Sequence, residues 1–333
     1  MTGVITVVVP VRDEATTVAA TLRSVAAQTI GAERIELLVL DGCSSDGTGE
    51  ICRRFADAAP WHRFAVRRNA ARTVPHALNA GLADARGEWF TRVDGRTTLS
   101  REYLEVCTDA AGRHGGATAV GGRLVTIADG AVATAIAAVV THPLGVGRGF
   151  RLPIHTETEV GHHPFAVWRT EDVRSYGGFR EELTRNQDDE FSMRARARGA
   201  RIYVTPAAVV SYRPRTRIRG LAAQYFQYGL WKAAVGRSTG LFPLQSVAPA
   251  AVTAGAAAAL GAAVTGRSRL PLALALASYG TAAAAVSLTR PGARPDLTLA
   301  ALAAAHLSYG TGVLCGAAAP TLTRHGPGQA RVR

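Results

Sequence analysis

The chain has 333 residues, 47% of them hydrophobic, and a formal net charge of +13. This length allows one large domain and an additional region. The positive charge suits nucleic acid or an anionic membrane surface. Because the basic residues between 207 and 240 directly precede an apolar region, and no nucleic-acid-binding motif lies beside them, the sequence favours a membrane partner and excludes nucleic acid.

Residues 1–237 alternate between expected strands and expected helices. β-Branched or apolar runs predict strands at 4–9, 35–40, 64–66, 87–93, 118–124 and 164–168. Helical spacing predicts helices that include 18–29, 51–55, 75–85 and 101–110. This alternation predicts right-handed βαβ units and a mostly parallel, Rossmann-like sheet, hence an α/β fold. The apolar stretch 131–146 fits either a core helix or a membrane-interface segment.

Acidic residues stand where three of these strands end. Asp41 terminates a buried strand, where a carboxylate needs a partner, and it can accept hydrogen bonds from a nucleobase. Asp94 can hold a divalent cation that bridges two phosphates. The residue two places later, where another ligand is usual, is Arg96, whose guanidinium can itself neutralise phosphate. Since ligands of open α/β sheets bind at the carboxyl ends of the strands, these residues predict a polar site there.

A second acidic group, Asp188-Asp189-Glu190, lies at an expected helix start. The helix dipole favours carboxylates at this position, so capping accounts for one or two of the three. A carboxylate close to an acceptor hydroxyl is also a suitable general base. The neighbouring His162-His163 fits ordinary loop histidines or residues near the entry of an acceptor.

The region 238–322 is apolar, and a basic tail occupies 323–333. Its uncharged stretches lie near 241–265, 270–289 and 297–320, each close to the ~20 residues that span a bilayer. Three such stretches predict about three membrane helices, although a buried helical hairpin in a soluble protein is the alternative. Arg267 and Arg269 between the first two stretches argue against a simple three-span topology. Four cysteines without metal spacing, and an N-terminus without a signal-peptide pattern, fit a catalytic domain in the cytosol.

Four motifs occur in a fixed order: VVVPVRDE, LDGCSSDGT, RNAARTVPHALNAGLADARGEWFTRVDGR and RNQDDEF. Together with the later QYFQYGLWKA, they resemble the family 2 inverting glycosyltransferases with the GT-A fold, and in particular the succinoglycan-type exopolysaccharide enzymes. The resemblance covers about residues 4–232. It implies a GT-A domain over 1–237 followed by C-terminal transmembrane helices.

The resemblance also implies roles for individual residues. The implied nucleotide-sugar-binding residues are Pro10, Arg12, Glu14, Asp41, Arg68, Asn69, Arg72, Asp94 and Arg96. Asp94 matches the first acid of the metal-binding motif, so Mg²⁺ or Mn²⁺ is the implied cofactor. Asp188 matches the catalytic base, and its neighbour Asp189 can take the same role.

The implied reaction is a single displacement at the anomeric carbon of a nucleotide-sugar by a hydroxyl of a glycan acceptor, which we expect to be lipid-linked. The expected location is the cell membrane, with the catalytic domain facing the cytoplasm. Two other functions stay open at this point: sugar transfer to polyprenyl phosphate, and a catalytically silent scaffold that binds nucleotide, which the Arg96 substitution suggests.

Overall fold

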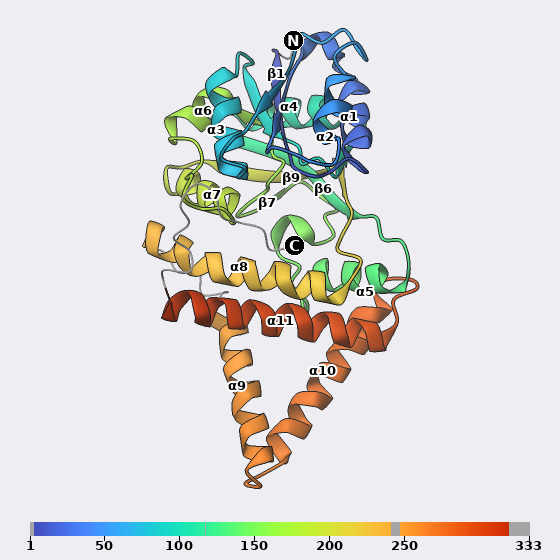
Figure 1. Ribbon diagram of the computed structural model, residues 1–333, viewed down its shortest axis with the longest axis vertical. Helices are drawn as coiled ribbons and strands as arrows, with labels where there is room; N and C mark the ends of the chain where they lie inside the picture. Colours follow the sequence, from blue (N-terminus) through green and yellow to red (C-terminus); the bar gives the residue numbers. More distant parts are fainter. Residues whose placement is uncertain (1–2, 117, 241–246, 320–333) are drawn as a thin grey trace. The chain divides into compact units, whose positions relative to one another are not determined.

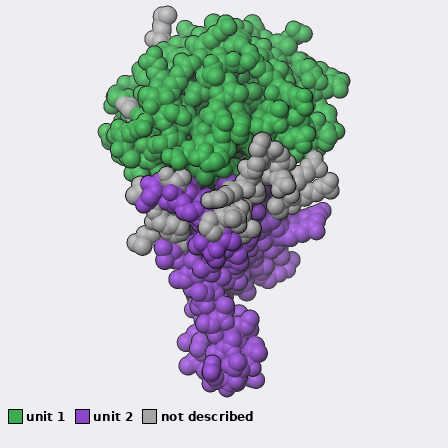
Figure 2. Space-filling model, turned by 60° about the vertical axis from the view of Figure 1, so that its left-hand side comes forward, with its two compact units in different colours: residues 1–125, 153–213 green, residues 126–152, 214–333 purple. Residues whose placement is uncertain are grey.

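The computed structural model describes residues 3–116, 118–240 and 247–319. The start of the first expected membrane stretch, 241–246, and the basic tail 323–333 lie outside these residues. The chain forms two compact units, which Figure 2 shows in different colours. The first comprises residues 1–125 and 153–213, and the second comprises 126–152 and 214–333.

The first unit contains the predicted parallel sheet (Figure 1). Its strands are β1 (Ile5–Val11), β2 (Ile35–Asp41), β3 (Arg63–Arg68), β4 (Trp89–Arg92) and β8 (Trp168–Arg169), in the order β3-β2-β1-β4-β8. The first four are parallel, and β8 runs antiparallel to β4. All seven residues of β1 are buried, as a β-branched run covered on both faces requires.

Helices at bounds close to those predicted follow strands of this unit, and the first three of them connect the parallel strands. They are α1 (Val18–Ala26), α2 (Thr48–Arg53), α3 (Val74–Asp84) and α4 (Tyr103–His114). Helix α3 approaches the sheet closely, because a Cβ at Gly81 would overlap the methyl groups of Val8 on β1. Because β1 to β4 run parallel, their carboxyl ends lie at the same edge of the sheet.

A second sheet has the order β5-β9-β6, with β7 paired to β9. These strands are β5 (Thr97–Leu99), β6 (Thr118–Thr126), β7 (Thr158–Glu159) and β9 (Arg201–Tyr212). Helices α6 (Thr170–Ser175) and α7 (Gln187–Ala197) complete this unit, and α7 begins at the acidic group as predicted.

The strand predicted at 164–168 is mostly absent. Only Trp168 belongs to a strand, and the carbonyl of Phe165 accepts hydrogen bonds from the hydroxyls of Thr91 (3.1 Å) and Tyr103 (2.9 Å). Side-chain donors thus bind the backbone at Phe165, and Val167 forms only an isolated antiparallel bridge with Val120. An alternation of apolar residues does not reveal such donors.

The second unit consists of helices in the part of it that the structure describes: α5 (Ala131–Val140), α8 (Ile218–Thr239), α9 (Val247–Val264), α10 (Leu270–Leu288) and α11 (Pro295–Ala318). Three of them, α9, α10 and α11, are long and apolar enough to cross a membrane. Helix α5 is a core helix, since Ile136 and its neighbours pack against Leu221 of α8 and Leu302 of α11.

Candidate functional site

Asp41 lies at the centre of the carboxyl edge of the sheet. In the strand register it stands between Val11 of β1 and Arg68 of β3. Its Oδ1 accepts hydrogen bonds from the backbone N–H of Ser44 at 3.0 Å and from the Ser44 hydroxyl at 2.6 Å. Its carbonyl accepts from the N–H of Asn69 at 2.7 Å. The partner expected for this carboxylate is therefore present, and the loops after β2 and β3 are joined through one residue.

The loop after β1 is bound to the start of α2. The N–H of Glu14 donates to the Thr48 hydroxyl at 2.8 Å, and the N–H of Ala15 donates to Oδ2 of Asp46 at 3.0 Å. Oδ1 of Asp46 accepts from the N–H of Thr48, the first residue of α2, whose N-cap is Gly47. Its hydrogen bonds, first of all with Thr48, hold the pKa of Asp46 below its ordinary value. These contacts fix the position of Glu14.

Cationic side chains follow β3. The Nε of Arg68 contacts the Cys43 sulfur at 3.3 Å. This hydrogen bond, assisted by Arg72, lowers the pKa of the Cys43 thiol. Arg72 has a left-handed backbone, with φ of 61°, and its N–H donates to the carbonyl of Asn69 at 3.0 Å. Arg12, at the end of β1, packs beside the loop after β2. The site predicted for an anionic donor thus has its guanidinium groups on neighbouring loops.

The turn after β4 lies directly against the loop after β1. A Cβ at Gly95 would overlap Oε2 of Glu14, so the Glu14 carboxylate lies directly against the turn between Asp94 and Arg96. Both of these flanking residues are half-buried. Pro10, by contrast, is a buried residue inside β1. Its partner in the strand register is Leu40 of β2, the residue before Asp41.

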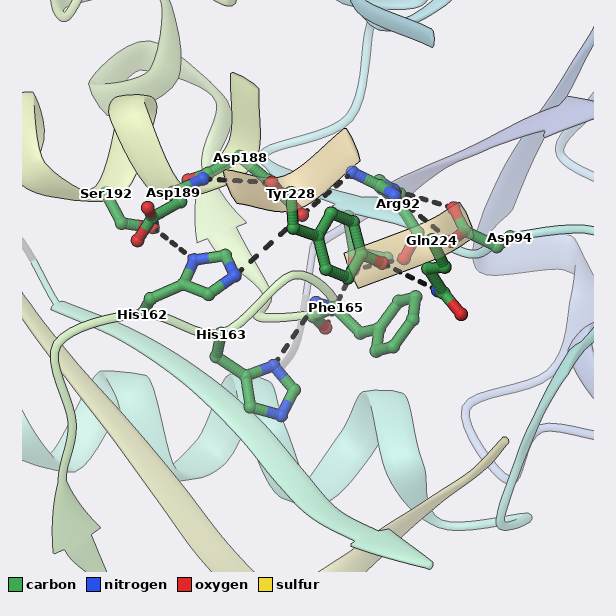
Figure 3. A network of polar contacts seen from close by, with 11 residues as sticks. Arg92, Asp94, His162, His163, Phe165, Asp188, Asp189, Ser192, Gln224 and Tyr228 are labelled. Carbon is green, nitrogen blue, oxygen red and sulfur yellow. Dashed lines mark hydrogen bonds and ion pairs between the residues drawn. The ribbon is translucent and has the colours of Figure 1, made fainter. Parts of the chain in front are cut away.

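The guanidinium of Arg92 joins Asp94 to Asp188 (Figure 3). Its Nε donates to Oδ1 of Asp94 at 2.7 Å, and Nη2 donates to Oδ2 at 3.0 Å, which makes a bidentate pair. Its Nη1 donates to Oδ2 of Asp188 at 3.3 Å. Two predicted site residues that are distant in sequence are thus held by one side chain, which is only 11% exposed.

Asp188 is ionised in this arrangement. Burial raises the pKa of its carboxyl, but the charges of His162 and Arg92 and the backbone N–H of Asp189 lower it further, so the result lies below the ordinary 3.8. The N–H of Asp189 donates to Oδ1 at 3.0 Å. The carboxylate is therefore charged at neutral pH and able to accept a proton. These contacts orient Asp188 within the network.

His162 faces the same carboxylate. Its Nε2 lies 3.8 Å from Oδ2 of Asp188, and its Nδ1 lies 2.9 Å from the hydroxyl of Ser192. The Ser192 hydroxyl donates its single proton to the carbonyl of Asp188 at 2.9 Å, so Nδ1 of His162 is the donor to Ser192. Of the two interpretations of this histidine, the structure favours a residue of the site.

His163 has a different role. It is buried, and desolvation lowers its pKa to about 3. Its Nε2 lies 2.8 Å from the carbonyl of Gly122, and its Nδ1 accepts from the N–H of Phe165 at 3.2 Å. A neutral ring with its proton on Nε2 satisfies both contacts. His163 therefore connects two backbone segments as a neutral core histidine.

The third acid of the predicted group is structural. Glu190 is fully buried and accepts two hydrogen bonds from Arg194, both at 2.9 Å. Arg180 adds an ion pair at 3.0 Å. Two guanidinium groups thus neutralise Glu190 and join α7 to the preceding loop.

Arg92 is not among the predicted site residues, although its place in GEWFTRV indicates a buried charge that needs a partner. An arginine at the end of a buried strand requires an anionic partner, and Asp94 follows two residues later. The partnership with Asp188 has no such signal, because it depends on where the loop before α7 returns to the sheet. Ser192 was missed for the same reason.

A divalent cation fits only an open site here. Within the described residues, no three His, Cys, Asp or Glu side chains gather as metal ligands. Asp94 alone, with a side chain that is 26% exposed, suits a cation that takes its remaining ligands from the phosphates of a bound donor.

The chain is similar to known proteins in sequence and in fold. The family model "Glycosyl transferase family 2" matches residues 6–172, half of the chain. Over 200 residues the chain is 30% identical to the succinoglycan biosynthesis protein ExoA of Rhizobium meliloti (strain 1021), and the aligned stretch covers 59% of each chain. The chain therefore spans less than two thirds of this relative.

Two further similarities extend the comparison. The dolichyl N-acetyl-alpha-D-glucosaminyl phosphate 3-beta-D-2,3-diacetamido-2,3-dideoxy-beta-D-glucuronosyltransferase of Methanococcus voltae is 22% identical over 68% of this chain and 72% of its own length. The mannosyltransferase PcManGT from Pyrobaculum calidifontis, solved with GDP-Man and Mn²⁺, has a TM-score of 0.61 at 23% identity and covers 93% of this chain and 87% of its own. The predicted GT-A fold is thereby confirmed.

Proposed function

Because this chain belongs to glycosyl transferase family 2, we propose that it is an inverting glycosyltransferase that moves one sugar from a nucleotide-sugar to a hydroxyl of a lipid-linked glycan. The supporting observation is the Arg92 network. It joins Asp94, where the donor's diphosphate is expected, to Asp188, where the acceptor's proton is expected. A transferase that couples donor and acceptor requires such proximity.

The proposed reaction is a single displacement. The carboxylate of Asp188 accepts the proton of the acceptor hydroxyl, and the oxygen of that hydroxyl forms a bond to the anomeric carbon. The bond from this carbon to the diphosphate breaks, and the diphosphate departs with its electron pair. Attack opposite the leaving group inverts the configuration. His162 and Arg92 hold the base in position through Oδ2.

The donor's nucleotide is proposed to occupy the edge formed by the loops after β1, β2 and β3. Asp41 offers Oδ2 as an acceptor for the base, since its Oδ1 is engaged by Ser44. Arg68 and Arg72, which follow β3, supply positive charge for the phosphates. Glu14 and Asn69 shape the same edge through their backbone contacts.

A divalent cation, Mg²⁺ or Mn²⁺, is proposed to bind at Asp94 together with the diphosphate. When bound, such a cation stabilises the charge that develops on the leaving group. Mn²⁺ accompanies GDP-Man in the structure of PcManGT. Arg96 stands at the position of a usual further ligand and supplies positive charge there.

The acceptor is proposed to be lipid-linked, and the protein to reside in the inner membrane with its catalytic unit toward the cytoplasm. Three apolar helices support membrane attachment. The Methanococcus relative is named for a dolichyl-phosphate-linked sugar acceptor, and the ExoA relative for succinoglycan biosynthesis.

The test begins with a thermal-stability screen of the purified chain against nucleotide-sugars, with and without Mn²⁺. Binding raises the melting temperature by mass action, so one nucleotide class should stand out. The stabilising donor is then supplied, labelled in its sugar, to membranes that contain the wild type or Asp188→Asn. Label in a lipid-extractable glycan only with the wild type supports the proposal. Transfer that persists in Asp188→Asn with polyprenyl phosphate as the acceptor would instead identify a polyprenyl-phosphate glycosyltransferase.

A further inference from the structure

The three apolar helices differ in what covers them. Among the described residues, helix α9 buries only Ala259, whereas α11 buries eight residues along its length. The large exposed apolar side chains of α9 and α10 are Val247, Val252, Leu260, Val264, Leu270, Leu274, Leu276 and Leu288. On α11 the corresponding side chain is Leu314. The exposed apolar side chains of α9 and α10 therefore require contact with lipid, whereas other helices of the chain already cover much of the surface of α11.

Helices α11 and α8 pack so closely that their backbones are in contact at glycine positions. A Cβ at Gly229 of α8 would overlap the carbonyl oxygen of Tyr309. A Cβ at Gly312 or Gly316 of α11 would overlap the carbonyl of Phe226 or Leu230 on α8. Small residues that allow such approach make a tight helix pair. Contacts advance together along both helices, so α8 and α11 run in the same direction side by side (Figure 1).

The end of this pair carries a charge. Nη1 of Arg237 on α8 donates to the carbonyl of Gly316 on α11 at 2.9 Å. Helix α8 also contains Gln224, Gln227 and Lys232, a composition that is too polar for the hydrocarbon core. If α11 crossed the bilayer, α8 would have to cross beside it and carry Lys232 and Arg237 with it. The pair is therefore confined to one side of the membrane.

Helices α9 and α10 form a hairpin of the right dimensions for crossing. They have 18 and 19 residues, which correspond to about 27 and 28 Å at the α-helical rise, close to the ~30 Å hydrocarbon core. Neither contains a charged residue. Arg267 and Arg269 lie at the tip, and Arg290 and Arg294 follow α10 at the base. Figure 1 shows the two helices meeting at the tip, away from α8 and α11.

We propose that α9 and α10 alone cross the bilayer, as a two-span hairpin, and that α11 stays with α8 at the membrane surface on the catalytic side. Full crossing places Arg267 and Arg269 among the headgroups of the far leaflet, whereas a hairpin ending at mid-bilayer would bury both charges. Two crossings return the chain to its starting side. The C-terminal end of α11 therefore lies on the same side as the catalytic unit. This inference rests on the membrane attachment proposed above.

The test is cysteine labelling of the full chain in intact cells with a membrane-impermeant maleimide. Ser268→Cys marks the tip of the hairpin and Ala318→Cys marks the end of α11; both positions are exposed. Both substitutions are made in a chain that carries Cys315→Ser, which removes the native cysteine of α11. The native Cys43, whose thiol has a lowered pKa, marks the side of the catalytic unit. Modified peptides are identified by mass spectrometry before and after permeabilisation.

We expect Ser268→Cys to react in intact cells, and Ala318→Cys to react only after permeabilisation, together with Cys43. Reaction of Ala318→Cys in intact cells would show that α11 crosses and would overturn the inference. Reaction of both positions only after permeabilisation would show a hairpin that does not reach the far side, which also overturns it. Release of the unmodified chain by an alkaline carbonate wash would contradict membrane attachment itself, so the two failures are distinguishable.

Discussion

Arg92 binds both carboxylate oxygens of Asp94, at 2.7 and 3.0 Å, and its remaining nitrogen reaches Asp188. The end of β4 and the start of α7 are thereby fixed relative to each other. One guanidinium thus serves as the cationic partner of two carboxylates.

Asp188→Asn should reduce transfer by about 10²- to 10⁴-fold, the range for loss of a general base. The amide keeps the size of the side chain but cannot accept the acceptor's proton. Donor affinity should remain near that of the wild type, because the nucleotide edge lies on other loops. Single-turnover kinetics and donor-dependent thermal stabilisation measure the two quantities separately.

Asp189→Asn is the matched control. Its backbone N–H, which donates to Asp188, is unaffected by the substitution. We expect Asp189→Asn to retain most of the turnover. A strong loss in this variant, combined with near-normal turnover of Asp188→Asn, would assign the base to Asp189.

Arg92→Met should shift the acidic limb of the kcat/KM profile to higher pH. The positive charge of Arg92 is one of the groups that lower the pKa of Asp188. Its removal raises that pKa, so Asp188 becomes protonated at a higher pH and activity falls sooner on acidification. The profile of Arg92→Lys should shift less, since lysine keeps the charge while losing the bidentate geometry.

Arg54→Lys serves as the control, because Arg54 and its partner Glu50 form an exposed pair on the surface. Its profile should coincide with that of the wild type. An acidic limb that stays in place in Arg92→Met would remove Arg92 from the electrostatics of the base.

The sheet could be predicted from the sequence because strands that are buried on both faces consist of continuous β-branched or apolar residues. The 4–9 and 35–40 runs correspond to β1 and β2 within two residues at each end. The strand predicted at 164–168 overlaps β8 only at Trp168, since the carbonyl of Phe165 is bound by the hydroxyls of Thr91 and Tyr103. Strand pattern alone carries no information about such distant donors.

The candidate site was predictable only in part, for a similar reason. Asp41 and Asp94 are marked by local context, because each follows a buried strand. The role of Glu190 as a structural anion depends on Arg180 and Arg194, and that of His162 depends on Asp188. These pairings arise from tertiary structure and leave no fixed spacing in the sequence.

Asp94→Asn should remove the Mn²⁺-dependent part of donor binding. A neutral amide is a weak ligand for a hard cation, and it cannot form the charged pair with Arg92. The measurement is the donor-induced rise in melting temperature across a Mn²⁺ titration, which follows the ratio of ligand concentration to Kd. The exposed Asp109→Asn on α4 is the control. Equal Mn²⁺ dependence in the two variants would end the assignment of the cation to Asp94.

Stability should depend on pH through Glu36, a fully buried carboxylate on β2. Burial raises its pKa, but hydrogen bonds from the Arg86 N–H at 2.7 Å, the Thr6 hydroxyl at 2.6 Å and Arg63 at 2.6 Å lower it below the ordinary 4.5. A lowered pKa in the folded state means that this stabilisation is present above pH 4.5. It is lost as the pH falls through the folded-state value.

Glu36→Gln should therefore lower the free energy of unfolding at pH 7 by about 3 kcal/mol, the order expected when a buried ion pair loses one partner. Urea unfolding measures this difference, which should narrow below pH 4.5 as the wild-type carboxylate becomes protonated. Glu50→Gln, in an exposed pair, should change stability by less than about 1 kcal/mol at either pH. A gap between wild type and Glu36→Gln that does not change on acidification would mean that Glu36 contributes through packing and not through its charge.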